Sequence, residues 1–158
     1  MLRTLTLSAA IAAMSFGAAA SALTTDHKVY KEIKTETPAG DVSITRELTD
    51  RVTPGENVIY ALAFENDHSE TVTGMVLTMP IPSQVAYIEG SAETQMAIST
   101  YSADNGGTYA PRDSVMTIDQ DGSLRPAKAE ELTHVRWKVT ERIAPQRGGE
   151  LSFKARLK

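Results

Sequence analysis

The residue types that most often carry chemistry are sparse in this chain, and none has a recognisable catalytic or metal-binding spacing. The histidines are His27, His68 and His134, and no pair has the H-x-x-x-H separation of a zinc motif. No G-x-S-x-G elbow is present to hold a serine nucleophile. Met75 and Met79 share one side of an extended chain, and without neighbouring histidines they are better explained as packing residues than as copper ligands. We therefore expect a non-catalytic protein with no metal site and no cofactor.

One segment does have a sharp local pattern of hydroxyl, carboxylate and glycine residues. It fits S-x-D-x-G-x-T-aromatic, and the motif residues are Ser102, Asp104, Gly106, Thr108 and Tyr109. The serine and aspartate side chains can accept hydrogen bonds from turn amides, glycine tolerates positive φ, and the aromatic ring can pack beneath the turn. The pattern resembles the Asp-box hairpin of sialidases and other β-proteins. That resemblance implies a structural turn rather than a catalytic one.

The same turn has a functional alternative, because loops carry binding residues more often than the elements they connect. Tyr101 and Tyr109 flank the turn. If both rings are exposed, they are the stacking surfaces for a glycan or another small ligand. We keep these two tyrosines as candidate ligand contacts.

A second acidic segment, residues 119–123, places Asp119 and Asp121 ahead of a glycine, as calcium-binding loops do. An EF-type loop also needs a bidentate glutamate at its twelfth position. Glu130 stands there, but it follows a segment interrupted by Pro126. We favour a turn with solvated carboxylates, and calcium binding, which calorimetric titration would detect, is the alternative.

These residues must be positioned by strands, because apolar residues recur with a period of two through most of the chain. The clearest alternating runs are 58–64, 135–139 and 151–157. Trp137 is expected in the core. Residues 41–48 are expected to form the first strand of the sandwich, with Val42, Ile44 and Leu48 facing inward.

Proline and glycine mark the turns between these strands. Pro80-Ile81-Pro82 removes two backbone donors, so we expect the sheet to break there. Residues 85–88 are expected to form a short strand, and Pro126 to Leu132 to make one helical turn. The whole pattern predicts an all-β sandwich.

The order of these motifs also resembles a known bacterial domain. The motifs are Val52, Pro54-Gly55, the alternating run to Phe64, Asn66, Pro80-Ile81-Pro82, Tyr87-Ile88, Gly90-Ser91 and Ile143-Ala144-Pro145. Over residues 42–158 they resemble the bacterial surface-repeat domain catalogued as domain of unknown function eleven. His68, Met79 and Gln84 depart from the residues usual there. The resemblance implies an immunoglobulin-like antiparallel β-sandwich in an exported bacterial protein, with no enzymatic activity of the domain itself.

The N-terminus has the character of an export signal. Arg3 precedes an alanine-rich apolar run, and Ala20-Ser21-Ala22 supplies the small-x-small pattern of a cleavage site. We expect residues 1–22 to be a cleaved signal peptide, 23–40 an N-terminal arm or edge strand, and 41–158 the sandwich. A retained membrane helix is less favoured, because the run is short for a bilayer core of ~30 Å. The mature protein is then periplasmic, extracellular or on the cell surface, without a transmembrane anchor.

The cysteine content and net charge of the chain limit which partners it can have and what can stabilise its fold. The chain has no cysteine, which excludes disulfides and an acylated lipoprotein cysteine, so stability must come from apolar burial. The net charge of −4 becomes −5 when Arg3 is removed, because Lys+Arg falls from 16 to 15 against 20 acidic residues. A mildly acidic chain argues against nucleic acid and anionic membranes as partners.

These features lead to a functional expectation with two alternatives. We expect a structural or interaction module of the bacterial cell envelope that binds a protein partner through loops or a sheet edge. The first alternative is a small glycan- or ligand-binding domain that uses Tyr101 and Tyr109. The second is a strand-donating assembly subunit, in which residues 27–36 complete the sheet of a neighbour.

Overall fold

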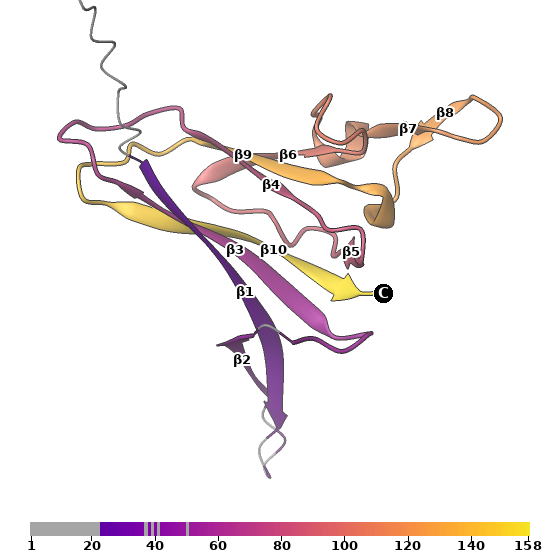
Figure 1. Cartoon of the computed structure of the whole chain (residues 1–158), viewed down its shortest axis with the longest axis horizontal. Helices are drawn as coiled ribbons and strands as arrows, with labels where there is room; N and C mark the ends of the chain where they lie inside the picture. Colours follow the sequence, from indigo (N-terminus) through magenta and orange to yellow (C-terminus); the bar gives the residue numbers. More distant parts are fainter. Residues whose placement is uncertain (1–22, 37, 39, 41, 50) are drawn as a thin grey trace, which may run out of the picture.

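A computed structural model describes residues 23–36, 38, 40, 42–49 and 51–158. The expected signal peptide, residues 1–22, lies outside the described residues. The described chain is all-β: antiparallel strands form one large and one small sheet in a sandwich arrangement, as Figure 1 shows. The expected fold class is therefore confirmed.

The larger sheet consists of five strands whose neighbours are all antiparallel. They are β1 (Leu23–Glu36), β2 (Val42–Leu48), β3 (Asn57–Asn66), β5 (Val85–Tyr87) and β10 (Gly148–Leu157). Their order is β2-β1-β3-β10-β5, so β2 and β5 are the edge strands.

The smaller sheet consists of three strands in the order β4-β9-β6. They are β4 (Val76–Pro80), β6 (Ala97–Ser102) and β9 (His134–Val139). A separate hairpin of β7 (Met116–Ile118) and β8 (Leu124–Pro126) projects beside it in Figure 1. Two 3₁₀ turns, Arg112–Ser114 and Ala129–Glu131, complete the described elements. No helix among the described residues is long and apolar enough to cross a membrane.

The core lies between the two sheets and is centred on aromatic rings. Trp137 of β9 and Phe153 of β10 are both fully buried, and their ring centroids are 6.5 Å apart. Phe153 also stacks on Tyr60 of β3 at 5.2 Å. Because the chain has no disulfides, its stability comes from apolar burial, and these rings supply much of the buried apolar area.

The close approach of β10 to β3 requires a glycine at position 148. Gly148 begins β10 opposite the end of β3, and a Cβ there would lie 1.9 Å from the carbonyl oxygen of Phe64. A side chain at this position would therefore force the two backbones apart. Glycine lets β10 pair with β3 from its first residue.

Proline ends β4 as expected, because the described strand stops at Pro80 at the edge of the smaller sheet. The expected helical turn is also present as the 3₁₀ turn Ala129–Glu131.

The N-terminal segment differs from the expectation for residues 23–40. Instead of a loose arm or an edge strand, β1 is an interior strand of 14 residues. Its residues 23–31 pair with β3, and its residues 30–36 pair with β2. Two partners stabilise a polar sequence that has few apolar residues of its own.

The expected inward orientation of the first sandwich strand is wrong. Val42, Ile44 and Leu48 of β2 do share one face, but they are 61%, 57% and 65% exposed. Figure 1 shows β2 at the outer side of the larger sheet, away from the smaller sheet. A period of two shows which side chains share a face, but it does not show whether another sheet covers that face.

Candidate functional site

The Asp104 turn forms the side-chain bonds expected of its motif. Ser102 Oγ donates to Asp104 Oδ1 at 2.7 Å and accepts from the Gly106 amide at 2.9 Å. The amide and hydroxyl of Thr108 donate to the two carboxylate oxygens of Asp104 at 2.9 and 2.7 Å. Because these bonds, first among them that from the Thr108 amide, stabilise the charged form, the pKa of Asp104 lies well below its usual range. Asn105 and Gly106 take the positive φ angles of 56° and 85°.

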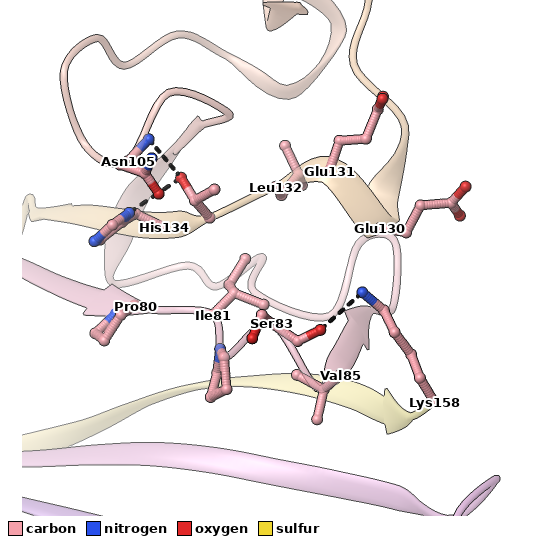
Figure 2. A pocket seen from close by; sticks show the side chains of 12 residues that line it. Pro80, Ile81, Ser83, Val85, Asn105, Glu130, Glu131, Leu132, His134 and Lys158 are labelled. Atoms are coloured by element: carbon pink, nitrogen blue, oxygen red, sulfur yellow. Dashed lines mark hydrogen bonds between the residues drawn. The ribbon is translucent and has the colours of Figure 1, made fainter.

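Beside this turn is a cavity of about 340 Å³, drawn in Figure 2. It lies between residues 80–85 and 130–134. Several of the polar groups around it are bonded within the chain itself. Lys158 Nζ donates to the Ser83 carbonyl at 3.0 Å, and Thr133 Oγ1 accepts from the Asn105 amide at 3.1 Å. Such engaged groups do not form a convergent set of ligand contacts.

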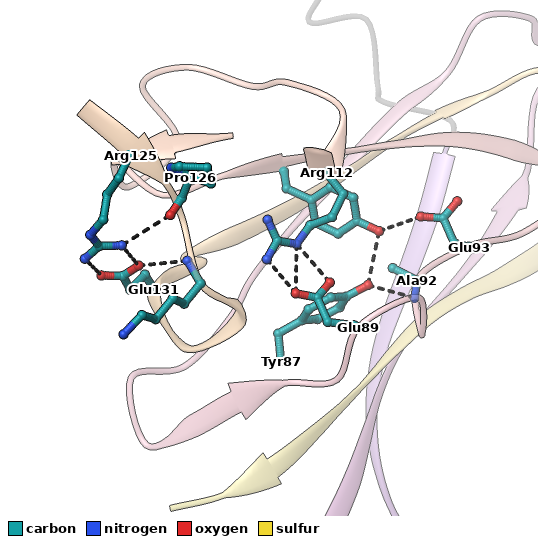
Figure 3. Close-up of polar contacts among 10 residues, drawn as sticks. Tyr87, Glu89, Ala92, Glu93, Arg112, Arg125, Pro126 and Glu131 are labelled. Carbon is teal, nitrogen blue, oxygen red and sulfur yellow. Dashed lines mark hydrogen bonds and ion pairs between the residues drawn. The ribbon is translucent and has the colours of Figure 1, made fainter. Parts of the chain in front are cut away.

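Tyr101 is not at the surface. It is 1% exposed, its hydroxyl donates to Glu93 Oε1 at 2.8 Å, and it lies 3.1 Å from the hydroxyl of Tyr87 (Figure 3). Burial raises the pKa of Tyr101 well above its usual range. The expectation that this ring is exposed is wrong, because it packs edge-on against Tyr87 with centroids 5.5 Å apart.

Tyr109 is partly exposed, but one face of its ring is covered. The guanidinium carbon of Arg136 lies 3.4 Å from the ring centroid. Arg136 Nε also donates to Thr78 Oγ1 at 3.2 Å. The two predicted tyrosines therefore do not form a shared stacking platform: Tyr101 is buried, and Tyr109 supports an arginine.

Two arginines tie the surrounding loops to carboxylates, as Figure 3 shows. Arg112 binds Glu89 through Nε and Nη2. Arg125 binds Glu131 through both terminal nitrogens at 2.7 and 2.6 Å, and this pairing lowers the pKa of Glu131 to about 2. These bidentate pairs hold the loops in place.

The acidic turn at residues 119–123 also uses its carboxylates locally. Asp119 accepts from the Gln120 amide at 2.9 Å and from Arg125 Nε at 3.2 Å. Asp121 Oδ1 accepts from both the amide and the hydroxyl of Ser123. In the described part of the chain, no group of three or more His, Asp or Glu side chains could hold a metal ion.

The edge of β2 presents a different kind of site. The Thr49 amide donates to the Val29 carbonyl at 3.1 Å, and bonded and non-bonded residue pairs alternate along an antiparallel ladder. Residues 43, 45 and 47 therefore bond to β1. The backbone groups of 42, 44, 46 and 48 point to the other side, where no described strand pairs with them.

Side chains hold this edge strand in a defined position. Arg46 crosses the Tyr30 ring, with 4.8 Å between guanidinium carbon and centroid, and reaches Glu150 of β10 at 2.6 Å. The one cation of β2 is thus directed back over its own sheet. Val42, Ile44 and Leu48 lie on the same face of the strand and are each more than half exposed, and Arg46 between them is about half exposed.

Sequence reasoning missed this edge as a specific site. The available signal was two polar-apolar runs, residues 29–36 and 42–48, joined by a short segment containing Pro38 and Gly40. Such a pattern predicts a hairpin. It does not show which strand of the hairpin is paired on both sides.

The comparisons add no relative to this geometry: no family model, no curated protein and no solved structure matches the chain.

Proposed function

We propose that this chain is an exported, non-catalytic structural or interaction module of the bacterial cell envelope that binds a protein partner through the edge of β2. The partner contributes an extended segment that pairs with β2 and enlarges the five-stranded sheet. The observation that carries the proposal is the exposed apolar row Val42, Ile44 and Leu48 on a strand whose outer backbone groups have no described partner.

Soluble proteins usually protect such edges, because unpaired backbone groups are a template for adding a strand. Lysine, proline and bulges are the common protecting devices. β2 contains neither lysine nor proline; its charged residues are Arg46, which is held by Glu150, and Glu47. An edge with so few protecting residues fits a surface that is covered by a partner.

Strand addition would use both backbone and side chains of β2. Backbone bonds to residues 42, 44, 46 and 48 supply affinity, and alternate side chains supply specificity. Because fully burying a large aliphatic side chain contributes about 1.5–3 kcal/mol, covering the exposed halves of Val42, Ile44 and Leu48 contributes about 1 kcal/mol each.

The two alternatives have less support in the geometry. A glycan platform of Tyr101 and Tyr109 would need two accessible rings, whereas Tyr101 is buried. Donation of residues 27–36 to a neighbour would require breaking their pairing with β3 and β2. We therefore propose that β2 accepts a strand rather than that β1 donates one.

Export is supported by the sequence alone. The residues before Leu23 have the pattern of a cleaved leader, and the motif order of the chain resembles an exported bacterial domain. We propose that the mature protein acts in the periplasm or at the cell surface.

The test is capture from envelope extract with tagged mature protein and two matched variants. Ile44→Lys places a charge on the β2 edge, whereas Ile118→Lys places it on the β7–β8 hairpin, where Ile118 is 69% exposed. We expect one protein to be retained by the unchanged chain and by Ile118→Lys but lost with Ile44→Lys. Equal retention by both variants would remove the β2 edge from the proposal.

A further inference from the structure

The outer face of the smaller sheet has a charge opposite to that of the whole chain. Trp137 and its inward neighbours Val135 and Val139 are buried, so Arg136 and Lys138 of β9 point outward. The outward positions of β4, β6 and β9 include no aspartate or glutamate. This is a cationic face on a protein whose net charge is −4.

Arg136 is held in place with most of its donors unused. Thr78 on β4 accepts from its Nε, and the Tyr109 ring lies against its guanidinium plane. No described carboxylate forms an ion pair with it, and no described group accepts from its terminal nitrogens. A guanidinium fixed by an aromatic ring, with both terminal nitrogens available, is suited to bidentate binding of a carboxylate.

The Asp104 turn is what places Tyr109 there. Thr108 is fixed to Asp104 by its amide and hydroxyl, and Tyr109 follows directly. The Asp104 turn therefore sets the position of the Tyr109 ring, which supports Arg136 at the surface.

Lys138 extends the face along β9. It is exposed and lies between Val76 of β4 and Ile98 of β6, which are 52% and 58% exposed. It forms no ion pair with a described carboxylate. Arg136 and Lys138 are two residues apart, so their Cα atoms are separated by about 7 Å along the strand.

We propose that this outer face binds an acidic, extended segment of a protein partner. Arg136 binds one carboxylate of the segment. Alternate side chains of an extended segment are also about 7 Å apart, so an acidic side chain two residues further along faces Lys138. Apolar side chains at the end of the segment pack on Val76 and Ile98. Charge complementarity selects this occupant, and the site is separate from the β2 edge, so it goes beyond the function proposed above.

The probe is a short fluorescent peptide of alternating glutamate and threonine with valine at both ends, added to the full mature protein at low salt. Its binding is followed by fluorescence anisotropy. We expect saturable binding that weakens as salt is added. Replacing the glutamates of the peptide with glutamines should abolish it.

Variants locate the site. Arg136→Gln should weaken peptide binding about tenfold or more, since bonds to a charged group are involved. Lys138→Gln should weaken it less, and Arg156→Gln on the larger sheet should leave it unchanged. Tyr109→Leu tests the positioning role of the ring: it should weaken binding, and Tyr109→Phe should restore it. Melting curves of each variant show whether the fold is retained.

Several results would overturn this proposal. They are equal binding of the glutamine peptide, unchanged binding by a folded Arg136→Gln, or no binding of the acidic peptide at all. Binding of polygalacturonate in place of the peptide would assign the face to an acidic glycan and also contradict a protein occupant. Ile44→Lys should leave peptide binding unchanged, so failure here is distinguishable from failure at β2.

Discussion

The Asp104 carboxylate holds its turn through hydrogen bonds from Ser102 and from the amide and hydroxyl of Thr108. We expect Asp104→Ala to lower the melting temperature by a few degrees, because these donors lose their acceptor. It should affect stability more than binding at the β2 edge. A variant that melts at the wild-type temperature would contradict the assignment of the turn.

The effect of Asp104 should depend on pH in one direction. Its folded pKa is lowered, so its contribution is present above the unfolded pKa of about 4 and is lost as pH falls through the lower folded value. The difference in melting temperature between the protein and Asp104→Asn should therefore be constant near neutral pH and narrow in acid. A difference that widens in acid would mean that the charged form is not the one stabilised.

The buried hydroxyl of Tyr101 allows a second test with a matched control. Tyr101→Phe leaves Glu93 without this donor and removes a partner of Tyr87, so unfolding free energy should fall by about 1–3 kcal/mol. Tyr30→Phe should change it little, because the Tyr30 hydroxyl has no hydrogen bond to a described residue. Urea unfolding followed by Trp137 fluorescence measures both. Equal effects would argue against the Tyr101 hydrogen bonds.

These residues show what local sequence can and cannot predict. The bonds between Ser102, Asp104 and Thr108 follow from short spacing, so the motif predicts them. The burial of Tyr101 depends on Tyr87 and Glu93, which come from a separate strand and its following loop. No local pattern contains that information.

At the scale of the element, β2 has two sets of backbone groups with different roles. The Thr45 amide faces β1, whereas the Ile44 amide faces the outer edge. Thr45→Pro should lower stability by about 1 kcal/mol or more, because it removes a bond of the β1–β2 ladder. Ile44→Pro should cost less and should still prevent partner capture, because proline is tolerated at an edge position that faces outward.

Melting curves and capture of the two variants separate these roles. If Ile44→Pro is the more destabilising of the two, the alternation of bonded pairs along β2 has been assigned the wrong way round.

The sequence predicted which side chains share one face of a strand, but it did not predict what covers that face. Alternation correctly placed Trp137 inward on β9, because the same face is covered by the larger sheet. Identical reasoning failed for Ile44, because nothing described covers that face of β2. The polar sequence of β1 suggested a loose arm. A strand paired on both sides is stabilised by backbone hydrogen bonds, and these leave no pattern in its side chains that could be recognised in the sequence.

At the scale of the whole molecule, the aromatic centre of the sandwich carries much of the stability. Phe153→Ala should cost about 3–5 kcal/mol, because the ring contacts Trp137 across the core and Tyr60 and Tyr87 of its own sheet. That loss is a large share of the 5–15 kcal/mol typical of a domain. Val76→Ala on the outer surface should change stability by less than about 0.5 kcal/mol. Similar losses for both would contradict the assignment of the core.

The all-β class was predictable because strand periodicity and turn residues agree along most of the chain. The division into a larger and a smaller sheet was not, since it depends on pairing between distant strands such as β3 and β10. That division decides which edge is left uncovered. The candidate site therefore follows from topology more than from any motif.

Strand addition to β2 by a partner should be visible in residue-resolved amide hydrogen exchange. In the protein alone, the amides of Thr45 and Glu47 should exchange slowly, because they bond to β1, while those of Ile44 and Arg46 should exchange fast. With the captured partner bound, we expect Ile44 and Arg46 to become protected. If their exchange stays fast in the complex, the partner does not pair with this edge, which contradicts strand addition to β2.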